Sequence, residues 1–149
     1  MRRLLFVQST GVKNLDQALT THYRERSDHF YHAMELLADD MAAYSTGVAL
    51  LAVHSCISLN DAIAAALTGR ASKHEDHLRA ADGLEKLCNT HRIRDQKGVG
   101  HFRWLLARKT GIAYGAKRLD PQFVGSAKDK AEKFSAWAYN NFEGVLRGL

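Results

Sequence analysis

The sequence predicts an all-α protein that folds as an antiparallel, up-and-down bundle of four to five helices. Its 149 residues include one proline, Pro121, so almost nothing in the chain removes a helical hydrogen bond. Alanine and leucine together number 39 residues against 11 valines and isoleucines, and this composition favours helix over strand. Apolar residues also recur at helical spacing, and no linker interrupts them, so we expect one domain over residues 1–149.

The first helix is indicated by apolar residues at the i, i+4, i+7, i+11 spacing of a buried face, namely Phe30, Met34, Leu37 and Met41. We expect this helix to begin near Asn14, an N-cap residue, after an irregular segment at 1–13. The segment Tyr44-Ser45-Thr46-Gly47 predicts a short turn into an antiparallel second helix.

Residues 48–67 are apolar on nearly every side, which predicts the central helix of the bundle. Gly69 predicts its end, and Ser72 and Glu75 have the spacing of a capping box for a third helix. We expect the buried face of the third helix to comprise Leu78, Ala81, Leu84 and Cys88. The polar connection 89–100, with a turn at Gly98-Val99-Gly100, is expected to be the most mobile loop.

The fourth helix is predicted to end near Gly115 and to bury Phe102, Leu105, Leu106, Lys109, Ile112 and Ala113. Lys109 is therefore a cation on an otherwise apolar, inward face. Asp120 and Pro121 predict the cap and first residue of the last helix, although we expect Gly125-Ser126 to delay it by a turn. Its buried face is predicted to carry Phe134, Ala138, Phe142 and Val145, with Trp137 beside them.

The net charge of +5 is concentrated between Arg70 and Arg118, where twelve basic residues stand against five acidic ones. If these residues share one face, they would attract phosphates or nucleic acid. The alternative is a pair of solvated helices with scattered charges. Arg70 and Lys73 precede the third helix, whose N-terminus could add phosphate contacts, but a capped turn without a ligand also explains this segment.

His54, Ser58 and Asp61 recur at i, i+4 and i+7 on the central helix and are the residue types of a hydrolase triad. Side chains stacked on one helix point in parallel, whereas a nucleophile, its base and an orienting acid must converge. Together with Asn60, these residues instead predict a polar stripe at an interface between helices or subunits. Asn60 and Asp61 need partners there, because an unpaired buried polar group is costly.

We predict neither a metal nor a cofactor. None of the eight histidines has a glutamate three residues before it, as a di-metal bundle requires, and no glycine-rich loop has phosphate-binding spacing. Glu25, His29, His32, His74 and His77 are interpreted as surface or capping residues. Cys56 and Cys88 predict reduced core thiols of a cytoplasmic protein. The chain shows no signal-peptide core and no run expected to span a membrane.

The segment Leu105–Gly115 closes an amphipathic helix with Arg108 and Lys109, and Tyr114 follows just before the last glycine. This arrangement resembles the motif on the fourth bundle helix of the HEPN superfamily. There an arginine and a histidine, roughly four to six residues apart, converge at a dimer interface. The resemblance extends in helix order and length over residues 23–146 and implies a HEPN-like bundle that forms a homodimer.

The sequence departs from the HEPN motif at the histidine. Lys109 or Arg108, depending on the register, matches the arginine, and Tyr114 takes the place of the histidine. HEPN proteins with the intact motif are metal-independent ribonucleases or toxins. A tyrosine with an ordinary pKa of about 10 is a poor general base near neutral pH, so the resemblance implies the scaffold more than the activity.

Three functions follow as hypotheses. In the first, the protein is a binding module for a nucleotide, RNA or a partner protein. Arg108 or Lys109 then pairs with phosphate, Tyr114 stacks or donates a hydrogen bond, and Arg70 and Lys73 add contacts. In the second, it is a divergent ribonuclease whose composite dimer-interface site uses Arg108, Lys109 and Tyr114 as catalytic residues. In the third, the bundle only stabilises a partner such as a nucleotidyltransferase.

Overall fold

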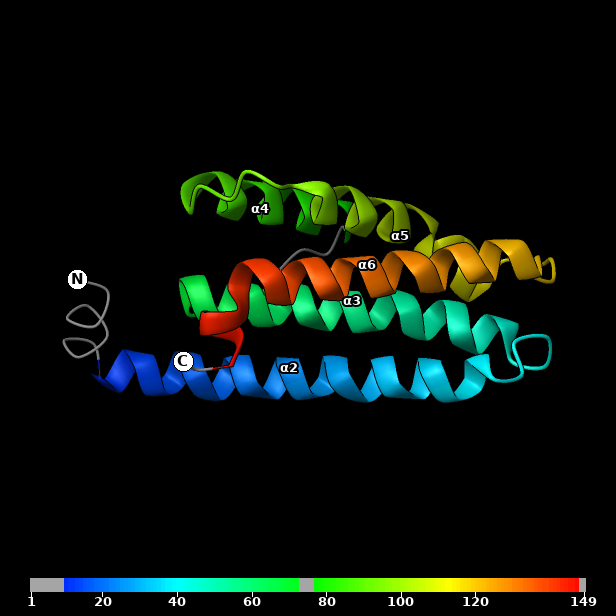
Figure 1. Ribbon diagram of the computed structural model, residues 1–149, viewed down its shortest axis with the longest axis horizontal. Coiled ribbons are helices and arrows are strands. Elements are labelled where there is room, and N and C mark those ends of the chain that lie inside the picture. Colours follow the sequence, from blue (N-terminus) through cyan, green and yellow to red (C-terminus); the bar gives the residue numbers. More distant parts are fainter. Residues whose placement is uncertain (1–9, 73–76, 148–149) are drawn as a thin grey trace.

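Five α-helices and no strand make up the part of the protein that the computed structural model describes, residues 10–72 and 77–147. The helices are α2 Thr10–Ala38, α3 Ser45–Thr68, α4 His77–Thr90, α5 Lys97–Tyr114 and α6 Pro121–Leu146. The predicted all-α class and helical bundle are therefore confirmed for these residues. Helix α3 contacts all four other helices. Helix α2 lies on one side of it, and α4 and α5 lie on the other (Figure 1).

Helix α3 takes this central place because it is apolar around most of its circumference. Val48, Val53 and Ala65, which are about 100–140° apart around the helix axis, are all inaccessible. Gly69 ends the helix as predicted. Its φ of 79° lies in the left-handed region, and its N–H donates to the Ala65 carbonyl at 2.9 Å.

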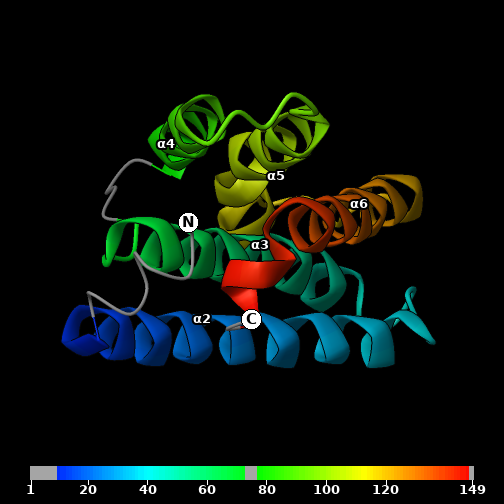
Figure 2. The same ribbon diagram turned by 60° about the vertical axis from the view of Figure 1, so that its left-hand side comes forward.

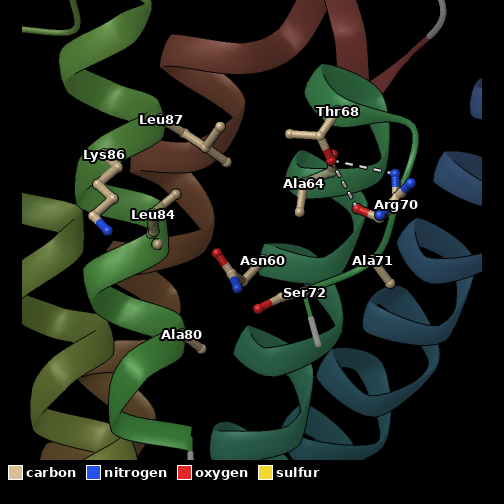
Figure 3. A pocket seen from close by; sticks show the side chains of 11 residues that line it. Asn60, Ala64, Thr68, Arg70, Ala71, Ser72, Ala80, Leu84, Lys86 and Leu87 are labelled. Carbon is tan, nitrogen blue, oxygen red and sulfur yellow. Dashed lines mark hydrogen bonds between the residues drawn. The ribbon is translucent and has the colours of Figure 1, made fainter. Parts of the chain in front are cut away.

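The chain turns back along α3 after Gly69, and this changes the expected topology. The backbone N–H of Ser72 donates to the carboxylate of Asp61, about two turns before the end of α3. Helix α4 then runs beside α3 in the same direction (Figure 3). Helices α2 and α3 are antiparallel, as expected for an up-and-down bundle, but α3 and α4 are not (Figure 1).

Helix α2 and its following turn differ from the prediction in their limits. Asn14 lies inside α2, so the prediction that the helix begins there is wrong. Residues 1–9 of the expected irregular segment lie outside the described residues. The turn spans 39–44 instead of 44–47, because Asp40 closes it: its carboxylate accepts from the Ala43 N–H at 3.3 Å, and its carbonyl from the Tyr44 N–H at 3.1 Å. Helix α2 packs on α3 as an outer helix (Figure 2).

The connection between α4 and α5 spans only residues 91–96 and is closed by hydrogen bonds at both ends. Arg92 has a φ of 57°, and the Ile93 N–H donates to the Cys88 carbonyl at 2.8 Å, which together form a Schellman C-cap. The Gln96 amide donates to Asn89 Oδ1 at 2.8 Å. The prediction of a long mobile loop over 89–100 is therefore wrong.

The first turn of α5 contains Gly98-Val99-Gly100, which the sequence predicted to be a turn outside the helix. Trp137 of α6 explains the glycine at position 98. Its indole Nε1 donates to the Asp95 carbonyl at 2.7 Å, and its ring covers Gly98 so closely that a Cβ there would lie 2.0 Å from Trp137 Cδ2. A glycine in a helix can thus mark close packing instead of a break.

Helix α6 begins as predicted, with Pro121 as its first residue and the Asp120 carboxylate accepting from the Gln122 N–H at 2.7 Å. The helix continues through Gly125-Ser126, so the expected delay is wrong. Phe134 and Trp137 lie in the core, where the Phe134 ring stacks on Phe102 with centroids 5.0 Å apart.

Two residues expected in the core are exposed. Leu78 is 48% exposed, because α4 turns Ala80, Ala81 and Leu84 inward instead. Ala113 is exposed near the end of α5, where Ile112 is buried. The other residues of the two predicted faces are buried or half-buried.

We expect Gly98→Ala to lower the free energy of unfolding by about 1–3 kcal/mol, because the new methyl group overlaps the Trp137 ring. Gly100→Ala is the matched control: it lies two residues along α5 with open space around its Cβ position. It should raise the stability by about 0.5–1 kcal/mol through helix propensity. Urea unfolding of both variants is the measurement. Equal changes would contradict the packing of Trp137 on Gly98.

Candidate functional site

Four helices each contribute one basic or protonatable side chain to a region beside α3, which we call the polar cluster: Arg26 of α2, His54 of α3, His77 of α4 and Lys109 of α5. Lys109 Nζ lies 2.7 Å from His77 Nε2. A lysine ammonium can only donate, so the contact requires His77 Nε2 to accept and to carry no proton. The two histidines and Lys109 are half-buried, and Arg26 is exposed.

His54 lies among positive charges and is partly shielded from water. Burial lowers its pKa first, the charges of Lys109 and Arg26 lower it further, and His77 acts in the same direction when it is protonated. The Phe30 ring lies 5.9 Å from the imidazole, between centroids, and the Arg26 guanidinium lies over the same ring at 5.6 Å. His54 is therefore neutral at pH 7, and an anion placed beside it would raise its pKa.

Asp61 lies on the same face of α3, two turns after His54. Burial raises its pKa to about 6, while the hydrogen bond from the Ser72 N–H and the charge of Arg26 act in the opposite direction. Asp61 and His54 thus have pKa values displaced in opposite directions, and Arg26 acts electrostatically on both.

One protomer does not assemble the three residues suggested by the HEPN-like motif. Lys109 lies in the polar cluster, on the inward side that its spacing predicted. Arg108 lies against Trp104 instead, with its guanidinium 4.0 Å from the ring centroid and a hydrogen bond of 2.9 Å to the Trp104 carbonyl. Tyr114 is 84% exposed at the last residue of α5. Their roles in binding or catalysis stay predictions.

The predicted polar stripe on α3 divides between two surroundings. His54 and Asp61 are half-buried beside the polar cluster, and Ser58 is buried. Asn60 turns toward α4, where it is 3% exposed and its Oδ1 has no hydrogen-bond partner among the described residues. Arg70 lies near the C-terminal half of α4, and Lys73 falls outside the described residues, as does Glu75 of the predicted capping box.

His77 and Arg26 are the residues of the polar cluster that sequence reasoning missed. Neither belongs to a motif, and His77 was interpreted as a surface or capping residue. Its contact with Lys109 depends on how α4 packs against α5, which no periodicity within a single helix reveals. The only available signal was the position of Lys109 on an apolar face, which called for a polar partner.

Metal-binding groups, the two cysteines and the apolar helix α3 do not indicate a further functional site among the described residues. No group of three or more His, Cys, Asp or Glu side chains in the described residues could hold a metal ion. Cys56 and Cys88 are buried, and burial raises their pKa values to about 12 and about 11, so neither is a reactive thiolate. Helix α3 is long and apolar enough to cross a membrane, but 72% of its most apolar window is buried in the bundle.

Comparison with known proteins gives no relative from which a function could be transferred. No family model, no curated protein and no solved structure matches this chain. The candidate sites must therefore be judged by their own geometry and charge.

We expect Asp61→Asn to raise the free energy of unfolding at pH 7.5 by about 1–2 kcal/mol, because the buried carboxylate must ionise there at a cost. The folded-state pKa of Asp61 is raised, so its contribution to stability is present at pH values below its unfolded pKa and is lost as the pH rises through about 6. The increase in the free energy of unfolding that Asp61→Asn produces at pH 7.5 should therefore vanish near pH 4. Urea unfolding at both pH values measures it.

Asp82→Asn is the control of opposite sign. Its exposed ion pair with Arg103 lowers the pKa of Asp82, so the charged form is favoured in the folded state. This variant should leave the stability at pH 7.5 unchanged or slightly lower. Destabilisation of the protein by Asp61→Asn at pH 7.5 would contradict the prediction and would indicate that the attraction to Arg26 outweighs burial.

Proposed function

We propose that this protein is a binding module that holds a phosphate group of a nucleotide or an RNA strand in the polar cluster. The observation that carries the proposal is the 2.7 Å contact between Lys109 Nζ and His77 Nε2, next to His54 and Arg26. Among the described residues, neither Lys109 nor Arg26 forms a salt bridge with a carboxylate. Asp61 lies beside the cluster but is bonded to neither cation, so both are free to bind a phosphate.

The chemistry of the polar cluster suits a phosphate oxygen. Lys109 and Arg26 are donors that stay charged at neutral pH, and charge-assisted hydrogen bonds to phosphate are stronger than neutral ones. His54 is held neutral first by burial and then by neighbouring positive charge, and an anion would oppose the contribution of those charges to its lowered pKa. Binding should therefore be accompanied by proton uptake at His54 and should strengthen as the pH falls.

The resemblance to the HEPN superfamily adds a finer proposal about assembly. A HEPN-like homodimer in the cytoplasm would bring a second copy of α5 near the first. Arg108 and Tyr114, which lie outside the polar cluster of one protomer, could then contact a ligand that extends beyond it. The helix order and the motif at Arg108 to Tyr114 support this proposal.

A metal-independent ribonuclease is the second candidate function, and one observation favours it. Two imidazoles, His54 and His77, lie close enough to Lys109 to interact with it. A neutral imidazole can take a proton from a ribose hydroxyl, a protonated one can give a proton to the leaving oxygen, and an ammonium can stabilise the charge on phosphorus oxygens. The proposed binding site thus also carries the groups for acid–base cleavage.

Lys109→Gln is expected to weaken the binding of a short fluorescent RNA at least tenfold in low salt, because it removes the half-buried cation of the polar cluster. Fluorescence anisotropy at several salt concentrations measures this. The slope of the logarithm of the binding constant against the logarithm of the salt concentration should decrease in magnitude by about one. Lys117→Gln, which removes an exposed cation just after α5, is the matched control and should cost less than twofold. Equal effects of the two variants would place the RNA elsewhere.

The pH dependence of RNA binding is an independent test of the phosphate-binding proposal. RNA affinity of the unaltered protein should rise as the pH falls below the ordinary histidine pKa of about 6.5, because His54 takes up a proton and Asp61 loses its charge. His54→Gln should reduce this rise, and His54→Gln combined with Asp61→Asn should abolish it. Absence of RNA and nucleotide binding at all pH values would refute the binding proposal.

Cleavage of structured RNA in the presence of EDTA separates the two candidate functions. The binding proposal expects retention of RNA without cleavage at any protein concentration. Cleavage that disappears in His54→Gln and Lys109→Gln, but persists in Lys117→Gln, would establish the ribonuclease instead. Cleavage that persists in all three variants would indicate a contaminant.

A further inference from the structure

A pocket of about 400 Å³ lies between α3 and α4, on the side of α3 that Asn60 faces (Figure 3). This volume lies in the range of sites for small molecules, about 300–1,000 Å³. Its apolar walls are made of small or aliphatic residues: Ala64, Ala71, Ala80, Gly83, Leu84 and Leu87. The alanines and the glycine leave room for a flat ring between the two helices.

Asn60 provides an unused acceptor in this pocket. It is 3% exposed, its side chain points into the space between α3 and α4, and its Oδ1 has no partner among the described residues (Figure 3). A buried polar atom without a hydrogen bond destabilises the fold, and such atoms are rare. A ligand with an N–H donor would satisfy it.

Two cations line the same pocket nearer to solvent. Lys86 of α4 and Arg70 after α3 are exposed, and neither forms a salt bridge with another described residue. Thr68 holds the backbone of Arg70: its Oγ1 accepts from the Arg70 N–H at 3.2 Å, and its one hydroxyl proton can be donated to the Ala64 carbonyl at 2.7 Å or to the Arg70 carbonyl at 3.1 Å. The two cations lie on opposite sides of the pocket (Figure 3), so an acidic group at its mouth would meet one of them.

We propose that this pocket binds a small, planar and largely apolar molecule that carries an N–H donor and an acidic group, as an indole carboxylate does. The apolar walls would hold the ring, Asn60 Oδ1 would accept from the N–H, and either Arg70 or Lys86 would bind the acid. A nucleobase fits less well, because its edge carries several polar atoms and the buried wall offers one amide to pair with them. The pocket site does not rest on the phosphate site of the polar cluster.

Isothermal titration calorimetry with indole-3-acetate tests this proposal, with three comparison compounds. 1-Naphthaleneacetate has the ring and the acid but no N–H, and indole has the ring and the N–H but no acid. We expect each to bind at least tenfold more weakly than indole-3-acetate. Adenosine monophosphate should bind this pocket more weakly still. Absence of indole-3-acetate binding, equal binding of the naphthalene analogue, or preferential binding of the nucleotide would overturn the proposal.

Variants test whether the heat of binding measured by calorimetry comes from this pocket. Asn60→Leu should abolish the preference for indole-3-acetate over 1-naphthaleneacetate, and the free variant should melt at a higher temperature because it lacks the unpaired amide. Lys86→Gln and Arg70→Gln each change an exposed residue, and one of the two should weaken both acids while leaving indole unaffected. Lys117→Gln is the matched control without effect. Unchanged binding in Asn60→Leu, Lys86→Gln and Arg70→Gln would overturn the assignment, and the two charge variants keep the test valid if Asn60→Leu does not fold.

Discussion

The need to bury α3 on every side determines the rest of the structure. Val48, Val53, Ala62 and Ala65 of this helix are inaccessible and point to different sides of its axis, so no single partner helix could cover them all. Four helices therefore surround α3, and each contacts it directly. Because α3 fills the centre, its polar residues lie among the surrounding helices. His54 and Asp61 lie within electrostatic range of Arg26 of α2, and Asn60 faces α4, which is why the candidate sites are found there.

The elements that are determined by residues close together in the sequence could be predicted from the sequence. The Asp120 cap with Pro121, the left-handed Gly69 and the apolar length of α3 each follow from local chemistry, and the structure confirms them. The elements that depend on packing between distant segments could not. Gly98 is a helical residue because Trp137 covers it, and the direction of α4 depends on the Ser72 N–H binding Asp61. Neither contact leaves a periodic signal in the sequence.

The candidate site could likewise be predicted only where it depends on spacing within a single helix. Lys109 was predicted on an inward face from the spacing of its apolar neighbours, and the i, i+7 spacing of His54 and Asp61 predicted a shared face. Their convergence with His77 and Arg26 joins four helices and was beyond such reasoning. Arg108, adjacent to Lys109 in sequence, points to Trp104 because successive residues on a helix are separated by about 100°. Arg108 and Lys109, although adjacent in sequence, therefore lie in different surroundings.

Helix α4 connects the two features that the fold leaves incompletely satisfied. The unpaired Asn60 oxygen faces α4, and the contact between Lys109 and His77 lies at its first residue. Among the described helices α4 contacts only α3 and α5, whereas α3 and α6 each contact at least three others. A helix with few neighbours can separate from them at a lower free-energy cost than a central one. Ligands on either side of α4 would thus bind where the bundle is easiest to adjust, and both would stabilise the packing of α4 on α3.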